Sequence, residues 1–264
     1  MIQENIARAF SNQSSSFDSI EEKNAILKYM RKRIHACADS FVSAGNYMLE
    51  LNCGTGIDAL HFAKRNVKVL ATDVADGMIA ETKRKVKQEN LEDKIEVKQC
   101  SFTEISSLPE KGFDFVFSDF GGLNCIPDLS PVVKSVSEKL KPGGRVMFVI
   151  MPPVCPWEIV RFVKGDFKTA FRRFKRHGAK SHVEGEHFLS WYFTPNDLKK
   201  YFGPDFTMIH LEGLGSLVPP PYSEKFPRKF PRLFELLCKW ESGMKMITPF
   251  NRWCDHFIIV LKKK

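Results

Sequence analysis

Short apolar runs and amphipathic stretches alternate along the middle of this chain of 264 residues. Runs of strand length are each followed by a stretch whose apolar residues recur at helical spacing. The runs that we interpret as strands cover residues 47–52, 67–72, 94–99, 113–118 and 145–151, and helices are expected over 57–65, 75–89 and 129–140. This alternation predicts an α/β fold in which a parallel sheet carries helices on both faces.

The residues before the first expected strand, 1–45, are predicted to form a helical cover. Ser19 is interpreted as the N-cap of a helix, because a serine before a helical stretch can accept a hydrogen bond from a free backbone N–H. An apolar stripe at helical spacing follows at Ile26, Leu27, Met30, Ile34 and Cys37. We expect this stripe to pack against the rest of the domain.

Two long insertions, residues 152–193 and 215–254, interrupt the alternation after the fifth expected strand. In the first insertion a basic helix is expected over 166–177. The phenylalanines that would share one face of it are Phe167, Phe171 and Phe174. We expect that face to pack on the core, so that both insertions cover a site as lids.

Further elements are expected around the second insertion. Thr194 as N-cap and Pro195 at the first helical position predict a short helix in TPNDLKKYF. Residues 206–214 and 256–262 are interpreted as the sixth and seventh strands, and a helix is expected near 232–245.

The composition is that of a globular protein, and we expect one domain over residues 1–264 with its core in 46–151. Hydrophobic residues make up 43% of the chain and charged residues 27%. The first residues lack the apolar run of a secretory signal, and the longest apolar run, 146–154, is too short to span a bilayer. The seven cysteines are scattered without a CxxC pair, so we predict reduced thiols, a cytoplasmic location and no metal centre.

The net charge of +9 is unevenly distributed. Eight Lys and Arg residues and a single acid, Asp166, fall within residues 161–182. A uniformly basic surface would suggest a nucleic-acid-binding protein. This local cluster suggests instead an anionic acceptor, or contact with an anionic membrane that carries a lipid substrate.

The stretch LELNCGTGIDALHF, residues 49–62, places a carboxylate and two glycines at the end of the first expected strand. Glu50 lies in an apolar run, where an ionised carboxylate requires a partner. Gly54 and Gly56 allow the backbone to approach a ligand closely where the strand turns into a helix. The same glycines fit a tight structural turn equally well, and with Ala59 they loosely match a dinucleotide-binding pattern.

Two further segments point to a nucleotide-like ligand. Asp73 ends the second expected strand, in VLATDVADGM, where a carboxylate can accept hydrogen bonds from ribose hydroxyls. LKPGGRVMFVI, at 140–150, supplies a turn and a strand that would close one side of the same crevice.

Together these segments resemble the motifs of class I S-adenosylmethionine-dependent methyltransferases. LELNCGTG resembles the family's first motif, commonly ELGCGTG, and TD at 72–73 resembles its second, acidic motif. FDFVFSDFGGLNCIPDL takes the place of the fourth-strand motif, and LKPGGRVMFVI that of the fifth. The resemblance runs over about residues 46–151, with weaker agreement beyond. It implies a Rossmann-like seven-stranded sheet in the order 3-2-1-4-5-7-6, with the last strand antiparallel, and S-adenosyl-L-methionine as the cofactor.

The resemblance also implies roles for individual residues. Glu50 would lie near the methionine amino group of the cofactor, and Asp73 would hold the ribose hydroxyls. Further cofactor contacts are implied for Asn52, Gly54, Thr55, Gly56, Val74, Met78, Ser101, Phe102 and Asp119. Asn52 stands where glycine is common, which we expect to be tolerated if the backbone there is not left-handed. Ser101 stands where many relatives have an aspartate, so Ser101 and the backbone at Phe102 would hold the adenine.

The acceptor is expected beside the fourth strand, where Asp119 and Asn124 lie at the carboxyl end of the sheet. A role in capping turns is an equally good interpretation of Asn124. Glu158 and His187 are hypotheses for a general base, needed only if the acceptor is a protonated nucleophile such as a hydroxyl. His182 lies near His187 in the sequence, but the spacing favours solvated loop residues over a metal site.

These observations predict methyl transfer to a hydrophobic or aromatic small molecule, either neutral or anionic. The pI of 9.1 keeps an RNA methyltransferase open as an alternative, although SDFG follows the fourth strand where enzymes that methylate nucleobase amino groups carry a motif of the NPPY type. A dinucleotide-dependent oxidoreductase would rest on the glycine pattern alone. A regulator that binds the cofactor without catalysis is a fourth possibility. Nucleic acid is not an expected partner, peripheral membrane contact is left open, and no oligomeric state is predicted.

Overall fold

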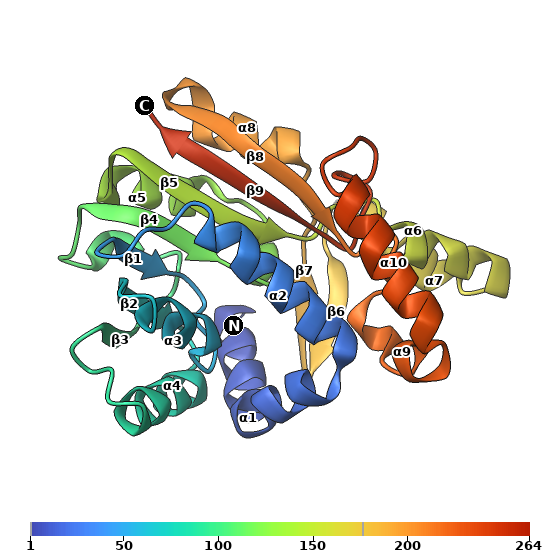
Figure 1. Ribbon diagram of the computed structural model, residues 1–264, viewed down its shortest axis with the longest axis horizontal. Helices are drawn as coiled ribbons and strands as arrows, with labels where there is room; N and C mark the ends of the chain where they lie inside the picture. Colours follow the sequence, from blue (N-terminus) through green and yellow to red (C-terminus); the bar gives the residue numbers. More distant parts are fainter. Residues whose placement is uncertain (1, 176) are drawn as a thin grey trace.

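A seven-stranded sheet forms the centre of the computed structural model, which describes residues 2–175 and 177–264 (Figure 1). The strands are β1 (Tyr47–Glu50), β2 (Lys68–Asp73), β3 (Ile95–Gln99), β4 (Phe113–Ser118), β5 (Leu140–Ile150), β8 (Phe206–Leu214) and β9 (His256–Lys263). Their order is β3-β2-β1-β4-β5-β9-β8, and β9 runs antiparallel to both of its neighbours. The predicted sheet order and antiparallel last strand are therefore confirmed.

Helices cover both faces of the sheet (Figure 1). One face carries α2 (Ala25–Asp39), α3 (Ile57–Ala63), α4 (Asp76–Gln88) and α10 (Pro231–Met244), and the other carries α5 (Ser130–Lys139) and α8 (Pro195–Phe202). Successive strand residues point to opposite faces. Met48 accordingly packs in the apolar cluster on the α2 side, and Leu49 packs in the cluster on the α5 side. Both side chains are fully buried, and each contributes about 1.5–3 kcal/mol to folding.

The N-terminal region forms two helices, α1 (Ile2–Lys23) and α2, instead of one helix capped by Ser19. Asn24 separates them with extended backbone, and its Oδ1 accepts hydrogen bonds from the backbone N–H groups of Ile26 at 3.0 Å and Leu27 at 3.3 Å. Ser19 lies inside α1, where its hydroxyl donates to the carbonyl of Ser16. The assignment of Ser19 as N-cap was wrong because asparagine caps a helix as well as serine does.

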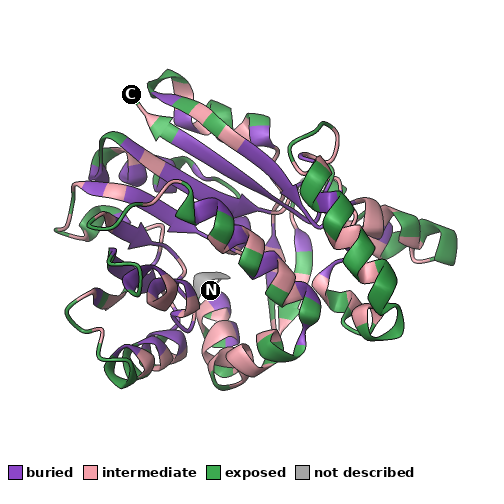
Figure 2. Cartoon of the chain, viewed as in Figure 1, coloured by how far each residue is buried: buried purple, intermediate pink, exposed green. Residues whose placement is uncertain are grey.

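The first insertion departs most from the expectation. In place of the helix expected over 166–177, the structure has α7 (Phe167–Ala170) and a 3-10 turn at Arg172–Phe174. Arg176, which the expected helix included, lies outside the described residues. The predicted packing of the phenylalanine face is wrong too, because the side chains of Phe167, Phe171 and Phe174 are exposed. Figure 2 shows the segment around α7 mostly in the colours of exposed and intermediate residues. A two-stranded hairpin follows, β6 (Ala179–Val183) with β7 (Glu186–Ser190), where a loop was expected.

The remaining elements connect these parts. Thr194 caps α8 as predicted: its Oγ1 accepts from the backbone N–H of Asp197 at 3.2 Å, and the Asp197 carboxylate accepts from the Thr194 N–H at 2.7 Å. Two short helices, α6 (Pro156–Ile159) and α9 (Phe226–Lys229), lie in the insertions, and further 3-10 turns lie at Ile105–Ser107, Gly122–Cys125, Val160–Lys164, Gly203–Asp205 and Pro221–Ser223. Within the described chain, we find no helix whose length and apolar character would carry it across a bilayer.

Candidate active site

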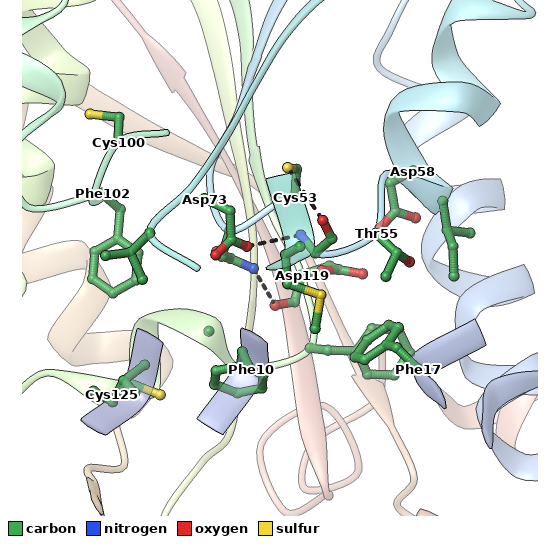
Figure 3. Close-up of a pocket in the computed structure, with 18 of the residues that line it drawn as sticks. Phe10, Phe17, Cys53, Thr55, Asp58, Asp73, Cys100, Phe102, Asp119 and Cys125 are labelled. Atoms are coloured by element: carbon green, nitrogen blue, oxygen red, sulfur yellow. Dashed lines mark hydrogen bonds between the residues drawn. The ribbon is translucent and has the colours of Figure 1, made fainter. Parts of the chain in front are cut away.

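A pocket opens at the carboxyl ends of β1, β2 and β4, where open α/β sheets bind their ligands (Figure 3). It encloses about 850 Å³ of empty space, part of it open to solvent. Helix α1 supplies one wall with Ile6, Phe10 and Phe17, and Phe102 and Phe120 extend the apolar lining. The pocket therefore combines an aromatic wall with the polar ends of the strands.

The turn after β1 places backbone against this pocket. Gly54 has a φ of 55°, and a Cβ there would meet no atom within 4 Å, so a side chain would project into open space at the pocket. Gly56 has a φ of 80°, and a Cβ there would lie only 2.7 Å from the Cγ2 of Thr82. The first glycine leaves room for a ligand, and the second lets α4 pack closely against the turn.

Asn52 also has left-handed backbone, with a φ of 49°. Asparagine therefore replaces the family's glycine although the backbone here is left-handed, which we had not expected. Asparagine adopts this conformation more readily than most residues other than glycine. Its side chain is used as well: Oδ1 accepts from the Ser118 hydroxyl at 2.6 Å, and Nδ2 donates to the carbonyl of Asp119 at 3.3 Å. Asn52 thereby joins the ends of β1 and β4 at the pocket floor.

Asp73 connects the same turn to the pocket from the end of β2 (Figure 3). Its Oδ2 accepts from the backbone N–H of Gly54 at 2.9 Å, and its Oδ1 accepts from that of Ala75 at 2.9 Å. Burial raises the pKa of the Asp73 carboxyl, and these backbone donors offset part of that rise. Each carboxylate oxygen has a second lone pair, so both can still accept hydroxyl groups of a ligand.

Glu50 is a buried carboxylate whose Oε2 has no hydrogen-bond partner in the described part of the chain. Burial raises its pKa well above the usual value, and the nearby charges of Asp58 and Asp119 raise it further, while Arg31 opposes them. Glu50 is not one of the described residues that form the pocket surface. An orphaned carboxylate oxygen is costly, and a positively charged ligand close by would offset that cost.

Arg31, on α2, is a residue of the pocket that sequence reasoning missed. Its Nη1 donates to Asp58 Oδ2 at 2.5 Å and to Asp119 Oδ2 at 2.9 Å, while its Nε and Nη2 donate to Glu21. Its guanidinium also lies over the ring of Phe120, 4.7 Å from the centroid. In the sequence Arg31 belongs to a run of basic residues, MRKR, that looks like a solvated helix face, so no signal distinguished it.

The two aspartates that share Arg31 differ in their pKa. Burial raises the pKa of Asp119 well above its usual value, and the adjacent Asp58 adds to the rise. Burial acts on Asp58 in the same direction, but the charge of Arg31 and a hydrogen bond with His35 hold its pKa well below the usual range. Around the pocket, the carboxyl groups of Glu50, Asp58, Asp73 and Asp119 thus outnumber the single guanidinium. The site favours a ligand that carries positive charge.

The other predicted cofactor residues are distributed unevenly. Thr55, Val74, Met78 and Phe102 line the pocket, and Cys100 lines it next to Phe102. Thr55 also donates from its hydroxyl to Asp18 on α1, at 2.5 Å. Ser101 does not line the pocket, and its hydroxyl is paired with that of Thr103 at 2.8 Å.

Of the predicted catalytic residues, Asp119 lines the pocket and Asn124 lies buried behind it. The Asn124 Nδ2 donates to the carbonyls of Met151 at 3.1 Å and Trp191 at 2.6 Å, and its Oδ1 accepts from the Met151 N–H at 2.9 Å. These bonds join the end of β5 to the residue after the hairpin. They use both N–H groups and the oxygen of the amide, so Asn124 forms a structural link.

The structure does not bring Glu158 or His187 to the pocket. Both oxygens of the buried Glu158 accept hydrogen bonds from Arg172, and Oε1 also accepts from Arg173. Burial acts to raise the pKa of Glu158, but these two arginines outweigh it and lower the pKa. His187 is exposed on β7, paired across the hairpin with His182 at 4.7 Å between ring centroids.

Comparison with known proteins bears on this pocket directly. Residues 48–144 match a family model described as a methyltransferase domain. The chain is 34% identical over 108 residues to demethylmenaquinone methyltransferase from Lactobacillus johnsonii. The aligned stretch covers 40% of this chain and 43% of the relative. It is 31% identical over 105 residues to ubiquinone biosynthesis O-methyltransferase from Acinetobacter baumannii, covering 40% of this chain and 44% of the relative. The chain thus spans less than half the length of these curated relatives.

A solved structure agrees over a longer stretch. An S-adenosylmethionine-dependent methyltransferase from Listeria monocytogenes superposes with a TM-score of 0.59 at 18% identity, covering 86% of this chain and 94% of that one. At this identity the likeness speaks for the fold alone. The residues that match the family model run from β1 to the start of β5. They include the turn after β1, Asp73 and Asp119.

The pocket residues fit S-adenosylmethionine, which carries a sulfonium and an ammonium group. Carboxyl groups outnumber the one guanidinium, Glu50 Oε2 lacks a partner, and Asp73 has lone pairs to offer to ribose hydroxyls. Residues 48–144 thus match a methyltransferase domain, and the sheet has the strand order that the resemblance to class I S-adenosylmethionine-dependent methyltransferases predicted.

Proposed function

We propose that this protein transfers a methyl group from S-adenosylmethionine to a small hydrophobic or aromatic acceptor. The observation that carries the proposal is the composition of one pocket. Its strand-end side holds several buried carboxylates with one counter-charge, and its other side is formed by phenylalanines of α1. The first side suits a cationic nucleotide, and the second suits an apolar acceptor.

Each cofactor contact follows from a residue of this chain. When bound, S-adenosylmethionine supplies an electrophilic methyl carbon on its sulfonium. Asp73 would hold the two ribose hydroxyls, and the Gly54 backbone would lie against the same part of the molecule. Glu50 would ionise as the cofactor binds, and its negative charge would then favour the ammonium end. Phe102 and Val74 would enclose the base, with Ser101 supporting the loop from behind.

Methyl transfer chiefly requires alignment of the acceptor and exclusion of water. Phe10, Phe17 and Phe120 would supply both, because they line the same pocket as Asp73. The acceptors named by the two relatives, demethylmenaquinone and an intermediate of ubiquinone biosynthesis, are in keeping with such an aromatic wall. If the acceptor atom carries a proton, Asp119 is the group we assign to receive it, because it lines the pocket and its buried carboxyl would ionise beside the cationic cofactor.

A labelled-methyl screen tests this proposal. The purified protein is incubated with S-adenosylmethionine labelled in its methyl group and with separate metabolite, lipid and RNA extracts. We expect label in an apolar small molecule, with transfer strongly reduced in Asp73→Ala and also reduced in Asp119→Asn. Label found only in RNA would overturn the proposed acceptor class, and the absence of transfer to any extract would speak for a cofactor-binding regulator.

A further inference from the structure

The first insertion presents an unusual surface, which we call the aromatic knob: residues 160–175, from the 3-10 turn at Val160–Lys164 through α7 to the turn at Arg172–Phe174. Its apolar side chains point outward. The exposed ones are Val160, Phe162, Val163, Phe167, Phe171 and Phe174. Val163 is 82% exposed and Phe167 is 58% exposed, which is far more than large apolar side chains show in a core.

The four phenylalanines form one patch. The ring of Phe162 lies 5.1 Å from that of Phe167 and 6.0 Å from that of Phe171, between centroids. The ring of Phe171 lies 6.3 Å from that of Phe174. A contiguous exposed apolar patch marks an interaction site, whereas scattered apolar residues do not.

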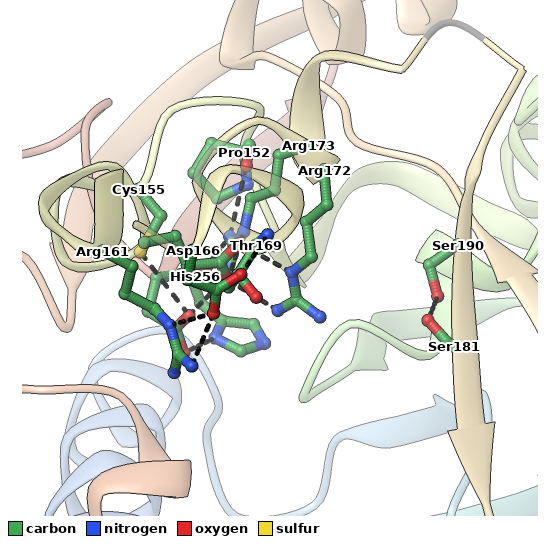
Figure 4. Close-up of polar contacts among 12 residues, drawn as sticks. Pro152, Cys155, Arg161, Asp166, Thr169, Arg172, Arg173, Ser181, Ser190 and His256 are labelled. Carbon is green, nitrogen blue, oxygen red and sulfur yellow. Dashed lines mark hydrogen bonds and ion pairs between the residues drawn. The ribbon is translucent and has the colours of Figure 1, made fainter. Parts of the chain in front are cut away.

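The knob is anchored firmly to the domain, so its outward apolar face is not the result of loose packing (Figure 4). The buried Arg173 donates to Glu158 Oε1 at 2.7 Å and to Asp255 Oδ1 at 2.6 Å, and also to the backbone carbonyl of Pro152. Arg172 binds Glu158 from the other side. These ion pairs connect the knob to α6 and to the residue before β9, and they hold its phenylalanines facing away from the core.

Positive charge surrounds the patch. Residues 160–175 contain six Lys and Arg residues and one acid, Asp166. Asp166 pairs with Arg161, and Arg172 and Arg173 pair with Glu158. The exposed Lys164, Lys168 and Lys175 have no carboxylate partner within the described residues. The knob therefore offers several free cations beside exposed apolar side chains.

We propose that the aromatic knob docks on the surface of an anionic lipid bilayer. Its phenylalanines and valines would enter the boundary between headgroups and acyl chains, and its lysines would bind the anionic headgroups. Nucleic acid would also attract the lysines, but it has no use for the aliphatic Val160 and Val163. This inference does not rest on the proposed methyl transfer, because membrane binding is measured without cofactor or acceptor.

A second exposed stripe lies at the same end of the molecule, on α10 and the residue before it (Figure 1). It comprises Phe230, Leu233, Leu236 and Trp240, with Arg228, Lys229 and Arg232 nearby in the sequence. The rings of Trp157 on α6 and Phe226 on α9 lie 6.4 Å apart, which joins the two insertions at this end. The wider surface has the same mixture of apolar and basic residues as the knob.

Vesicle flotation tests the docking surface. The full-length protein is mixed with vesicles of phosphatidylcholine alone, or of phosphatidylcholine and phosphatidylglycerol in equal parts. We expect it to float with the anionic vesicles only, and less so at high salt. The double variant Phe167→Ser/Phe171→Ser and the double variant Lys164→Ala/Lys168→Ala should each lower partitioning by about tenfold or more.

Matched controls separate docking from general effects. Lys83→Ala/Lys87→Ala on α4 removes the same charge elsewhere, and Ile209→Ser on β8 removes another exposed apolar side chain; both should leave flotation unchanged. Circular dichroism checks that every variant is folded. The proposal is overturned if the wild-type protein ignores anionic vesicles, if the controls lose as much binding as the knob variants, or if the knob variants instead lose binding to RNA or self-association.

Discussion

The buried carboxyl groups of Glu50 and Asp119, beside the pocket, and those of Glu158 and Asp255, at the base of the aromatic knob, differ in their pKa. In the pocket, burial raises the pKa of Glu50 and of Asp119, and Glu50 Oε2 has no partner among the described residues. At the base of the aromatic knob, the equally buried Glu158 and Asp255 have lowered pKa values despite their burial. The residue type and the depth are the same in both clusters.

The difference lies in the supply of partners. Arg31 is divided among Glu21, Asp58 and Asp119, and its guanidinium donates nothing to Glu50. At the knob, two arginines serve Glu158, and Arg173 and His256 serve Asp255. A cluster with complete partners is a structural joint, whereas one that leaves a carboxylate oxygen unpaired is prepared for a ligand that brings positive charge.

Arg173→Met should have the largest effect, and it acts on the cluster at the base of the aromatic knob. It would leave Glu158 short of one partner and Asp255 buried beside a single histidine, so the free energy of unfolding should fall by about 3–5 kcal/mol. Urea denaturation followed by circular dichroism measures the change. Arg172→Met is the matched control: it should cost clearly less, because Arg172 is partly exposed and Arg173 still binds Glu158. Equal losses from both variants would contradict the assignment of Arg173 as the joint.

Asp73→Ala should affect the pocket most strongly. The variant loses hydrogen bonds from a charged acceptor, so we expect roughly thirtyfold weaker binding of S-adenosylmethionine in calorimetry. Asp128→Ala serves as a control, since Asp128 also accepts a backbone hydrogen bond, from Ser130, but lies outside the pocket. Unchanged affinity in Asp73→Ala would remove Asp73 from the site.

Glu50→Gln should change binding and stability in opposite directions. We expect roughly tenfold weaker cofactor binding, corresponding to about one pKa unit of interaction. Because the folded-state pKa of Glu50 is raised, the favourable contribution of Glu50 to the free energy of unfolding is complete at low pH. That contribution is lost as pH rises through the raised pKa. The variant should therefore be more stable than the wild type at neutral pH, and this advantage should vanish toward pH 4. A variant that is destabilised at neutral pH would show that Glu50 has a structural partner.

Ser101→Ala should have the smallest effect. The Ser101 hydroxyl bonds to Thr103 and does not line the pocket, so cofactor affinity should change by less than roughly twofold. Phe102→Ala, one residue further, should weaken binding more, because Phe102 is part of the lining. The reverse order of effects would restore the adenine contact that the sequence suggested for Ser101.

The elements around the pocket could be predicted because local sequence determines them. Alternating strands and helices, the glycine turn and Thr194 as a cap all depend on residues close together in the chain. Arg31 and the knob could not be predicted in this way. Arg31 reaches Asp58 and Asp119 across long stretches of sequence, and the phenylalanines of the knob follow a helical spacing that predicts burial. Arg173 beside them binds Glu158 and, 82 residues away in the sequence, Asp255, contacts that helical spacing does not reveal.

Calorimetric titration with S-adenosylmethionine, repeated at neutral pH in buffers of different ionisation enthalpy, tests the central claim most directly. The buried carboxyl groups of Glu50 and Asp119, whose pKa is raised, should ionise as the cationic cofactor binds. We therefore predict one site per chain and a release of protons on binding that is smaller in Glu50→Gln. No binding of the cofactor, or binding with no proton released, would contradict the account.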